Sequence, residues 1–219
     1  MPVKENVLRL KEDLPSQVTL VAVSKTKPPQ MVQEAYEAGQ RDFGENYVQE
    51  LVEKQATLPG DIRWHFIGHL QSNKVKYIAP FVHLIQGVES LRLLKEINKQ
   101  GAKNGRVISV LLQLHIAMEE TKFGLSFEEC RSILYSAELS TLKHVKICGL
   151  MAMASNTEDD EVVKREFLSV KQFHDSVKGD HPDLSILSYG MSGDYQIAIT
   201  CGSTMVRVGS LIFGERQYN

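Results

Sequence analysis

The sequence predicts an α/β fold, a closed (β/α)8 barrel (TIM barrel) preceded by a leading N-terminal helix. Short apolar runs alternate with longer amphipathic stretches along the whole chain, which is typical of strands and helices in alternation. The runs are almost continuously apolar, as are strands that a parallel sheet buries on both faces. About eight such runs fit into 219 residues, which suits a compact barrel better than an open sheet.

The elements follow in order from these patterns. The leading helix is expected over residues 3–13, with Val3, Val7, Leu8 and Leu10 on one face. Strands are predicted near residues 18–24, 41–44, 63–68, 83–88, 106–114, 145–151, 185–189 and 204–208. Helices are predicted near residues 29–38, 46–57, 72–79, 90–101, 126–138, 158–178 and 194–200, with room for another turn after the last strand.

A doubly wound open sheet of six or seven strands is the alternative architecture. The sequence has no GxGxxG after the first predicted strand, which disfavours a dinucleotide-binding version of that sheet. No linker, repeat or low-complexity tract interrupts the chain, so residues 1–219 are expected to form a single domain.

Composition narrows the classes of function. A net charge of −2 without a long basic stripe disfavours nucleic acid as a partner. No apolar run reaches the roughly 20 residues that span a bilayer, and the N-terminus lacks a signal-peptide pattern. Cys130, Cys148 and Cys201 form no CxxC pair and are typical of a reducing compartment. We therefore expect a cytoplasmic protein without membrane partners.

Lys25 is the most informative single residue. The apolar run that precedes it, Leu20–Val23, ends just before it, and Pro28 follows three residues later, so its amine is expected at the C-terminal mouth of a buried strand. A lysine that is partly desolvated there has a lowered pKa and can form a Schiff base with an aldehyde. An exposed strand-end lysine is the alternative interpretation.

Glycines and hydroxyl side chains follow the last two predicted strands. The segment 190–193, which contains Met191 and Ser192, and the segment Gly209–Ser210 both allow backbone amides to approach an anion. In barrels a phosphate site often lies at these two loops. Either segment alone is more typical of a turn, but together they predict a phosphate cradle.

No metal site or familiar nucleophile is predicted. His65 and His69 are four residues apart, but along an extended chain this spacing is about 13 Å, which disfavours a shared metal. The acidic stretch 155–161 lacks EF-hand spacing and is typical of a helix N-terminus. No G-x-S-x-G motif indicates a serine nucleophile.

Long segments of the sequence resemble the YggS/PROSC family of pyridoxal 5′-phosphate (PLP) homeostasis proteins. The matching stretches are AVSKTKP at 22–28, FGENYVQE at 43–50, WHFIGHLQSNK at 64–74, GLM at 149–151, GMSGDY at 190–195 and GSTMVRVGSLIFG at 202–214. They cover almost the whole chain in the family's order. The resemblance implies a modified TIM barrel like the N-terminal domain of alanine racemase, which belongs to the fold-type III PLP proteins.

The resemblance also implies a cofactor site. It implies PLP bound as an internal aldimine to Lys25, a phosphate held around Ser192 and Gly209–Ser210, and Arg207 facing the pyridine nitrogen. Asn46, His65 and Met191 occupy positions near the cofactor in this resemblance. Two departures stand out: Tyr189 replaces a methionine that is frequent in the family, and Ser210 replaces a threonine but keeps the hydroxyl.

The expected function follows from Arg207 and from the end of the chain. An arginine beside the pyridine nitrogen disfavours its protonation, which makes the ring a poorer electron sink. The related racemases take a second base from a C-terminal domain, which is not expected after Asn219. We therefore expect a monomeric PLP-binding protein of vitamin B6 homeostasis without a dedicated catalytic cycle. A small PLP-dependent racemase and a phosphate-binding barrel unrelated to PLP are the alternatives, and transfer of PLP to apoenzymes is left open.

Overall fold

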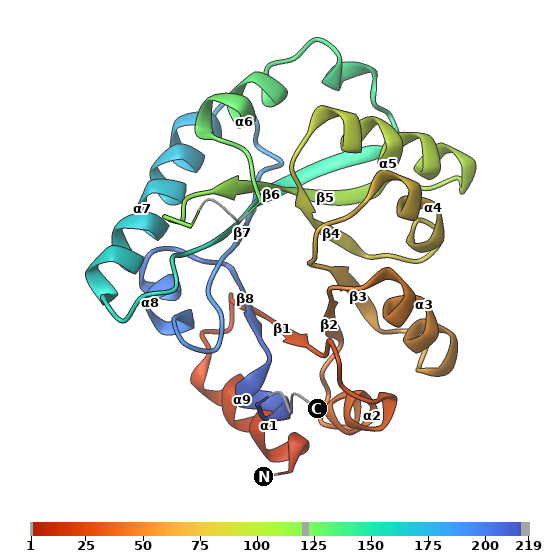
Figure 1. The fold of residues 1–219 in the computed structure, drawn as a ribbon, viewed down its shortest axis with the longest axis vertical. Helices are drawn as coiled ribbons and strands as arrows, with labels where there is room; N and C mark the ends of the chain where they lie inside the picture. The colour runs from red at the N-terminus through yellow and green to blue at the C-terminus, as the bar shows by residue number, and fades with distance from the viewer. Residues whose placement is uncertain (1, 120–122, 216–219) are drawn as a thin grey trace.

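Eight parallel strands close into a barrel in sequence order (Figure 1). The structure is a computed structural model that describes residues 2–119 and 123–215. The strands are β1 (Thr19–Val23), β2 (Asp42–Glu45), β3 (Arg63–Phe66), β4 (Leu84–Val88), β5 (Ile108–His115), β6 (Val145–Met153), β7 (Ile186–Ser188) and β8 (Met205–Val208). The barrel closes where β1 pairs with β8, with Val21 opposite Arg207. The predicted (β/α)8 barrel is confirmed, and the open sheet is excluded.

The helices lie outside the barrel and follow the predicted order. They are α1 (Val3–Asp13), α2 (Pro29–Glu37), α3 (Val48–Thr57), α4 (Val75–Ile78), α5 (Leu91–Lys103), α6 (Phe127–Leu134), α7 (Asp160–Val177), α8 (Tyr195–Thr200) and α9 (Ser210–Phe213), with 3-10 turns at Ser72–Lys74 and Leu139–Thr141. The leading helix α1 lies beside α9 in Figure 1, where Asn6 Nδ2 donates a 3.0 Å hydrogen bond to the Ile212 carbonyl. This bond connects helix α1, which precedes the first strand, to helix α9, which follows the last strand.

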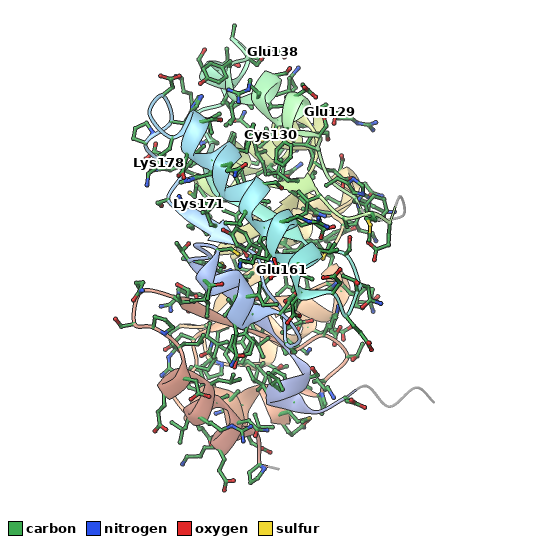
Figure 2. All side chains as sticks on the ribbon, turned by 90° about the vertical axis from the view of Figure 1, so that its left-hand side faces the viewer. Glu129, Cys130, Glu138, Glu161, Lys171 and Lys178 are labelled. Carbon is green, nitrogen blue, oxygen red and sulfur yellow. The ribbon has the colours of Figure 1, made fainter. Side chains whose placement is uncertain are left out.

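Local sequence sets where several helices begin. Ser126 and Glu129 form a capping box at the start of α6. The acidic stretch before α7 is a helix N-terminus, as predicted, because the Asp159 side chain accepts from the backbone amides of Glu161 and Val162. Figure 2 shows α6 and α7 side by side. Glu161 and Lys171 lie on α7, and Cys130, which is buried, lies on α6.

Alternation along the strands separates two packing regions. One set of residues, such as Leu20, Phe43, Trp64 and Val206, packs outward in the large core cluster between the strands and the helices. The other set faces the barrel interior and includes a small apolar cluster of Val21, Leu84, Leu111, Met151 and Met205. Buried polar side chains share this interior, and they determine the chemistry at its two ends. In the two described ranges no helix is long and apolar enough to cross a membrane.

Candidate functional site

Seven of the eight predicted site residues line one cavity of about 370 Å³ at the C-terminal ends of the strands. They are Lys25, Asn46, Met191, Ser192, Arg207, Gly209 and Ser210. The cavity is also lined by residues outside the predicted set, namely Val23, Lys27, Ile67, Met153, Gly193 and Gly214. Except for Gly214, which follows α9, these residues end or follow a strand, so the rule that barrel sites lie at the C-terminal strand ends could have found them.

A tight turn presents Lys25 at the end of β1. The Lys27 amide donates a 3.0 Å hydrogen bond to the Ser24 carbonyl, which closes the turn around Lys25. Thr26 adopts a φ of 64°, a left-handed conformation that is strained for a β-branched residue. Its amide donates to Glu50 Oε1 at 2.6 Å, and this bond holds the strained turn in place.

A buried lysine supports the same turn from behind the barrel wall. Lys54 on α3 is 3% exposed, and its Nζ donates to the Ser24 carbonyl and to Glu45 Oε1, both at 2.7 Å, and to Glu50 Oε1 at 2.9 Å. Ser24 Oγ donates to the same Glu45 oxygen. Burial raises the pKa of Glu45 although Lys54 and Ser24 oppose the shift. Sequence reasoning missed Lys54 because a lysine on an amphipathic helix is normally exposed.

Arg207 is held rigidly at the inner side of the cavity. Its NH1 donates to the carbonyl and the hydroxyl of Ser188 at 2.8 Å each, and its NH2 donates to the Ala152 carbonyl at 3.0 Å. The side chain is buried, and burial lowers its pKa to about 10. Arg207 therefore presents a positive charge in one fixed orientation.

The two glycine-containing loops are joined at the cavity. Ser192 Oγ accepts a 3.2 Å hydrogen bond from the Gly209 amide, which links the loop after β7 to the loop after β8. Gly190 has a φ of 99°, and a Cβ there would lie 2.5 Å from the Ala198 side chain. A glycine is therefore required where the chain leaves β7 for this loop.

Asn46 offers an unused acceptor. Its Oδ1 is buried and makes no hydrogen bond to any residue within 2–119 or 123–215. Gly68 on the neighbouring strand end lets the chain pass, since a Cβ there would lie 2.4 Å from the Asn46 carbonyl oxygen. A buried polar atom without a partner carries a free-energy cost, which a ligand donor would remove.

The charge of the cavity favours an anion. Lys25, Lys27 and Arg207 are the charged residues among the described side chains that line it, and none of the lining residues is acidic. Val23, Ile67, Met153 and Met191 supply apolar surface beside them. The cavity therefore suits a small molecule with an apolar ring and a negatively charged group.

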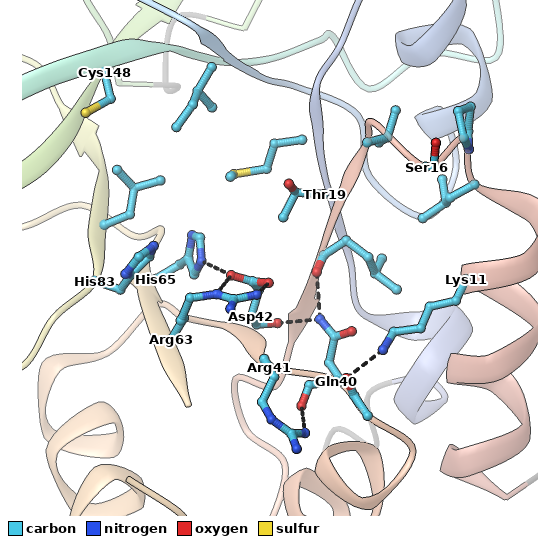
Figure 3. Close-up of a pocket in the computed structure, with 18 of the residues that line it drawn as sticks. Lys11, Ser16, Thr19, Gln40, Arg41, Asp42, Arg63, His65, His83 and Cys148 are labelled. Carbon is cyan, nitrogen blue, oxygen red and sulfur yellow. Dashed lines mark hydrogen bonds and ion pairs between the residues drawn. The ribbon is translucent and has the colours of Figure 1, made fainter. Parts of the chain in front are cut away.

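The structure places His65 apart from the other seven predicted site residues. Its neighbours Trp64 and Phe66 pack outward in the core, so His65 points into the barrel, where it is 1% exposed. It lines a different cavity of about 600 Å³ at the N-terminal strand ends, together with Asp42, Arg63 and His83 (Figure 3). The resemblance placed His65 near the cofactor, but its strand position carries the ring towards the opposite mouth.

The structure also places His69 and Tyr189, two residues that the sequence analysis singled out. His69 Nδ1 lies 3.0 Å from Glu89 and the ring stacks on Phe123, whereas His65 contacts Asp42, so the two histidines do not share a site. Tyr189 is fully buried against Phe167, and its hydroxyl donates to the Cys201 carbonyl at 2.8 Å. The tyrosine therefore packs in the core outside the barrel wall and is not among the residues that line the cavity with Lys25.

Comparison with known proteins identifies the family. The family described as "Alanine racemase, N-terminal domain" matches residues 2–217. The chain is 40% identical to the pyridoxal phosphate homeostasis protein of Pasteurella multocida over 211 residues, covering 93% of this chain and 89% of that protein. It is 39% identical to the Escherichia coli K12 protein of the same name over 212 residues, covering 94% and 88%.

Solved structures agree with this relationship. PipY of Synechococcus elongatus PCC7942 with PLP bound superposes with a TM-score of 0.89 at 35% identity and covers 97% of this chain and 100% of PipY. The alanine racemase of Clostridium difficile 630 shares the fold with a TM-score of 0.81 at 16% identity, and this chain spans 58% of that protein. The barrel, the lysine-bearing cavity and these matches agree, and the chain belongs to the family of pyridoxal phosphate homeostasis proteins, built on the alanine racemase N-terminal domain.

Proposed function

We propose that this chain binds PLP in the cavity at the C-terminal mouth and serves intracellular PLP homeostasis, with Lys25 as the Schiff-base lysine. The observation that carries the proposal is the convergence in one cavity of Lys25, Arg207 and an Asn46 oxygen that has no partner within 2–119 and 123–215, where the described lining residues include no acidic side chain. The PLP-bound structure of PipY, at 35% identity, supports the same ligand.

The residues present fit the chemical groups of PLP. The Ser192 and Ser210 hydroxyls and the amides around Gly193 offer hydrogen-bond donors for a phosphate, while the Gly209 amide already holds Ser192 in place. Val23, Ile67 and Met153 offer an apolar surface for a ring, and Asn46 Oδ1 can accept a hydrogen bond from a ligand hydroxyl. PLP supplies an aldehyde that an uncharged lysine amine attacks, and Lys25 is the lysine that the turn at β1 presents to the cavity.

Arg207 favours binding over catalysis. A guanidinium stays protonated at neutral pH even with a pKa of about 10. Placed at the pyridine nitrogen, it would disfavour a second positive charge on that nitrogen. An unprotonated ring stabilises a carbanion poorly, so the site is suited to holding PLP without a dedicated catalytic cycle.

Absorbance and reduction test the proposal directly. The wild-type protein loaded with PLP should show the visible band of a Schiff base, and Lys25→Ala should lose it completely. Lys27→Ala is the matched control, because it removes an amine from the same loop and should keep the band. Borohydride reduction followed by peptide mapping should then locate the modification on Lys25. A colourless wild-type protein after incubation with PLP would contradict the proposal.

The racemase alternative has its own measurement. A small PLP-dependent racemase would exchange the Cα proton of an amino acid with deuterated solvent. We expect no exchange across a panel of amino acids under conditions in which the visible band is present. Exchange that is lost in Lys25→Ala would replace the homeostasis proposal with the racemase.

We further propose a cytoplasmic monomer that transfers PLP to apoenzymes. Exposed large apolar side chains in the described ranges belong to separate segments, for example Leu8 on α1, Tyr77 on α4, Val107 before β5 and Tyr135 after α6, which supports the monomer. Light scattering of the loaded protein tests it, with a dimer mass as the contrary result. Transfer is tested by adding the loaded protein to a PLP-dependent apoenzyme and following the return of that enzyme's activity.

A further inference from the structure

A chain of buried hydrogen bonds crosses the barrel interior from the cofactor cavity to the opposite mouth. Arg207 NH1 donates to Ser188 Oγ at 2.8 Å, and Ser188 Oγ donates to Gln86 Oε1 at 2.7 Å. Gln86 Nε2 lies 3.0 Å from His65 Nδ1, and His65 Nε2 lies 3.0 Å from Asp42 Oδ1. Five side chains from β2, β3, β4, β7 and β8 are thus connected without a gap.

The donors and acceptors fix the direction of every bond in this chain. An arginine can only donate, so the Ser188 oxygen accepts from it and its own hydrogen points to Gln86. The Gln86 amide nitrogen then donates to His65 Nδ1 and also approaches Met205 Sδ at 3.3 Å, where a carbonyl oxygen would be repelled. His65 therefore carries its proton on Nε2 and donates it to Asp42.

Because its members are buried, breaking any hydrogen bond of this chain costs free energy. Ser188 and Gln86 are fully buried, and His65, Arg207 and Asp42 are 1%, 3% and 7% exposed. A buried donor or acceptor that loses its partner keeps its desolvation penalty, so one broken bond is not replaced by water. Networks of this kind hold their members in a single arrangement. The orientation of Arg207 is thereby coupled to side chains that do not reach the cofactor cavity.

A metal site at the far end was the competing interpretation. Asp42, His65 and His83 each offer a ligand atom, and these atoms lie within 4.8 Å of one another (Figure 3). However, Arg63 Nε and NH2 already bind both carboxylate oxygens of Asp42, at 2.8 and 2.5 Å. The proton on His65 Nε2 occupies the lone pair that a metal would need. The Asp42 oxygens and His65 Nε2 therefore already have hydrogen-bond partners and are not available as metal ligands.

We propose that His65, Gln86 and Ser188 are positioning residues that hold the Arg207 guanidinium at the cofactor cavity, with Asp42 as the anchor of the chain. The proposal rests on the proposed function, in which Arg207 faces the pyridine nitrogen of PLP. It gives His65 a role in the site that acts through two other side chains. It also explains why a barrel interior that could be wholly apolar contains this row of polar residues.

The test uses the pyridine nitrogen as the reporter. The full chain is loaded with PLP labelled with nitrogen-15 in the ring, and the nitrogen resonance is recorded. Gln86→Met keeps the side-chain volume but removes the two hydrogen bonds by which Gln86 connects Ser188 to His65, so the resonance should shift, and the dissociation constant for PLP should rise roughly threefold to tenfold. Gln113→Met is the matched control, because Gln113 is a buried glutamine whose Nε2 donates to the Phe123 carbonyl and not to the chain. It should leave the resonance in place.

A resonance at the wild-type position in folded, loaded Gln86→Met would overturn the inference. If Gln86→Met does not fold, the wild-type protein decides: the two imidazole nitrogens of His65 should report the Nε2–H tautomer and shift when PLP is added, and unmoved signals would overturn the inference. The visible band separates the two proposals. Its absence in the wild type refutes the proposed function, whereas its presence with an unmoved ring nitrogen in Gln86→Met refutes the positioning role alone.

Discussion

Strand β2 carries a buried carboxylate at each end, and the two carboxylates shift their pKa in opposite directions. At the N-terminal end, burial alone would raise the pKa of Asp42, but hydrogen bonds from Arg63 and His65 outweigh it and hold the pKa far below 3.8. At the C-terminal end, burial raises the pKa of Glu45 above 4.5 although Lys54 and Ser24 pull the other way. Both carboxylates have a cation partner within 3 Å.

The difference lies in how completely each carboxylate is hydrogen-bonded. Both oxygens of Asp42 accept bonds, because the Arg63 fork binds them together and His65 adds a third donor. Glu45 receives Lys54 and Ser24 on the same oxygen, and its Oε2 has no hydrogen bond to the described part of the chain. A nearby cation therefore does not suffice to stabilise a buried carboxylate, and each oxygen needs its own donor.

Removing the cation beside Glu45 should have the largest effect on stability. Lys54→Met leaves Glu45 buried without its ion pair and removes a support of the Lys25 turn, so the free energy of unfolding should fall by about 3–5 kcal/mol. Urea denaturation measures it. Lys164→Met, on an exposed stretch of α7, is the control and should change little. Lys54→Met/Glu45→Gln should recover part of the loss, and a loss unchanged in the double variant would contradict the ion-pair explanation.

Removing the carboxylate at the other end should cost less, because its partner Arg63 is 49% exposed and can turn to water. Asp42→Asn keeps the shape but loses the charge-assisted bonds, and the expected loss is about 1.5–3 kcal/mol by urea denaturation. Asp61→Asn, which affects an exposed ion pair with Arg41, serves as the comparison and should be close to neutral. Equal losses in the two variants would show that burial of Asp42 does not strengthen its contribution to the free energy of unfolding.

The smallest effect is the pH dependence, and its sign should differ between the two ends. The pKa of Asp42 is lower in the folded state, so its contribution is present above pH 3.8 and is lost as the pH falls below that value. The pKa of Glu45 is raised, so the unfolded state ionises first and stability falls as the pH rises above 4.5. The test measures the free energy of unfolding against pH for the wild type, Asp42→Asn and Glu45→Gln. The difference between the wild type and Asp42→Asn should rise with pH, whereas the difference between the wild type and Glu45→Gln should fall. If both differences changed with pH in the same direction, the two carboxylates would not have oppositely shifted pKa values.

Much of the fold and the cofactor-sized cavity could be predicted from local patterns. The alternation of apolar runs and amphipathic stretches predicted the order of the strands and helices, because period and apolarity are properties of neighbouring residues. Lys25, Ser192 and Gly209 were found because barrel sites follow the strand ends, and those ends are visible as breaks in the apolar runs. Arg207 also lies at the end of the last predicted strand, but its expected role at the pyridine nitrogen came from the resemblance alone.

The residues that sequence reasoning misjudged are those whose surroundings come from other strands. Lys54 has the pattern of an exposed helix residue, but Glu45, Glu50 and the Ser24 carbonyl surround it in the fold. The resemblance placed His65 near the cofactor, but the inward face of β3 directs it to Asp42. Glu50 lies on the same helix as Lys54, but Glu45 of β2 and, for His65, Asp42 of β2 lie on another element, and a single sequence does not specify such pairings.

Patterns along the chain were enough to predict the barrel, the lysine at the end of β1 and the glycine and serine loops after β7 and β8. These features depend on short-range order: hydrophobic periodicity, proline and glycine placement, and strand ends. The folded arrangement was needed to see that the pKa values of the two β2 carboxylates shift in opposite directions and that Arg207 is connected to Asp42 through the barrel interior. Burial and hydrogen-bond partners set both properties, and closing eight strands into one barrel brings those partners together.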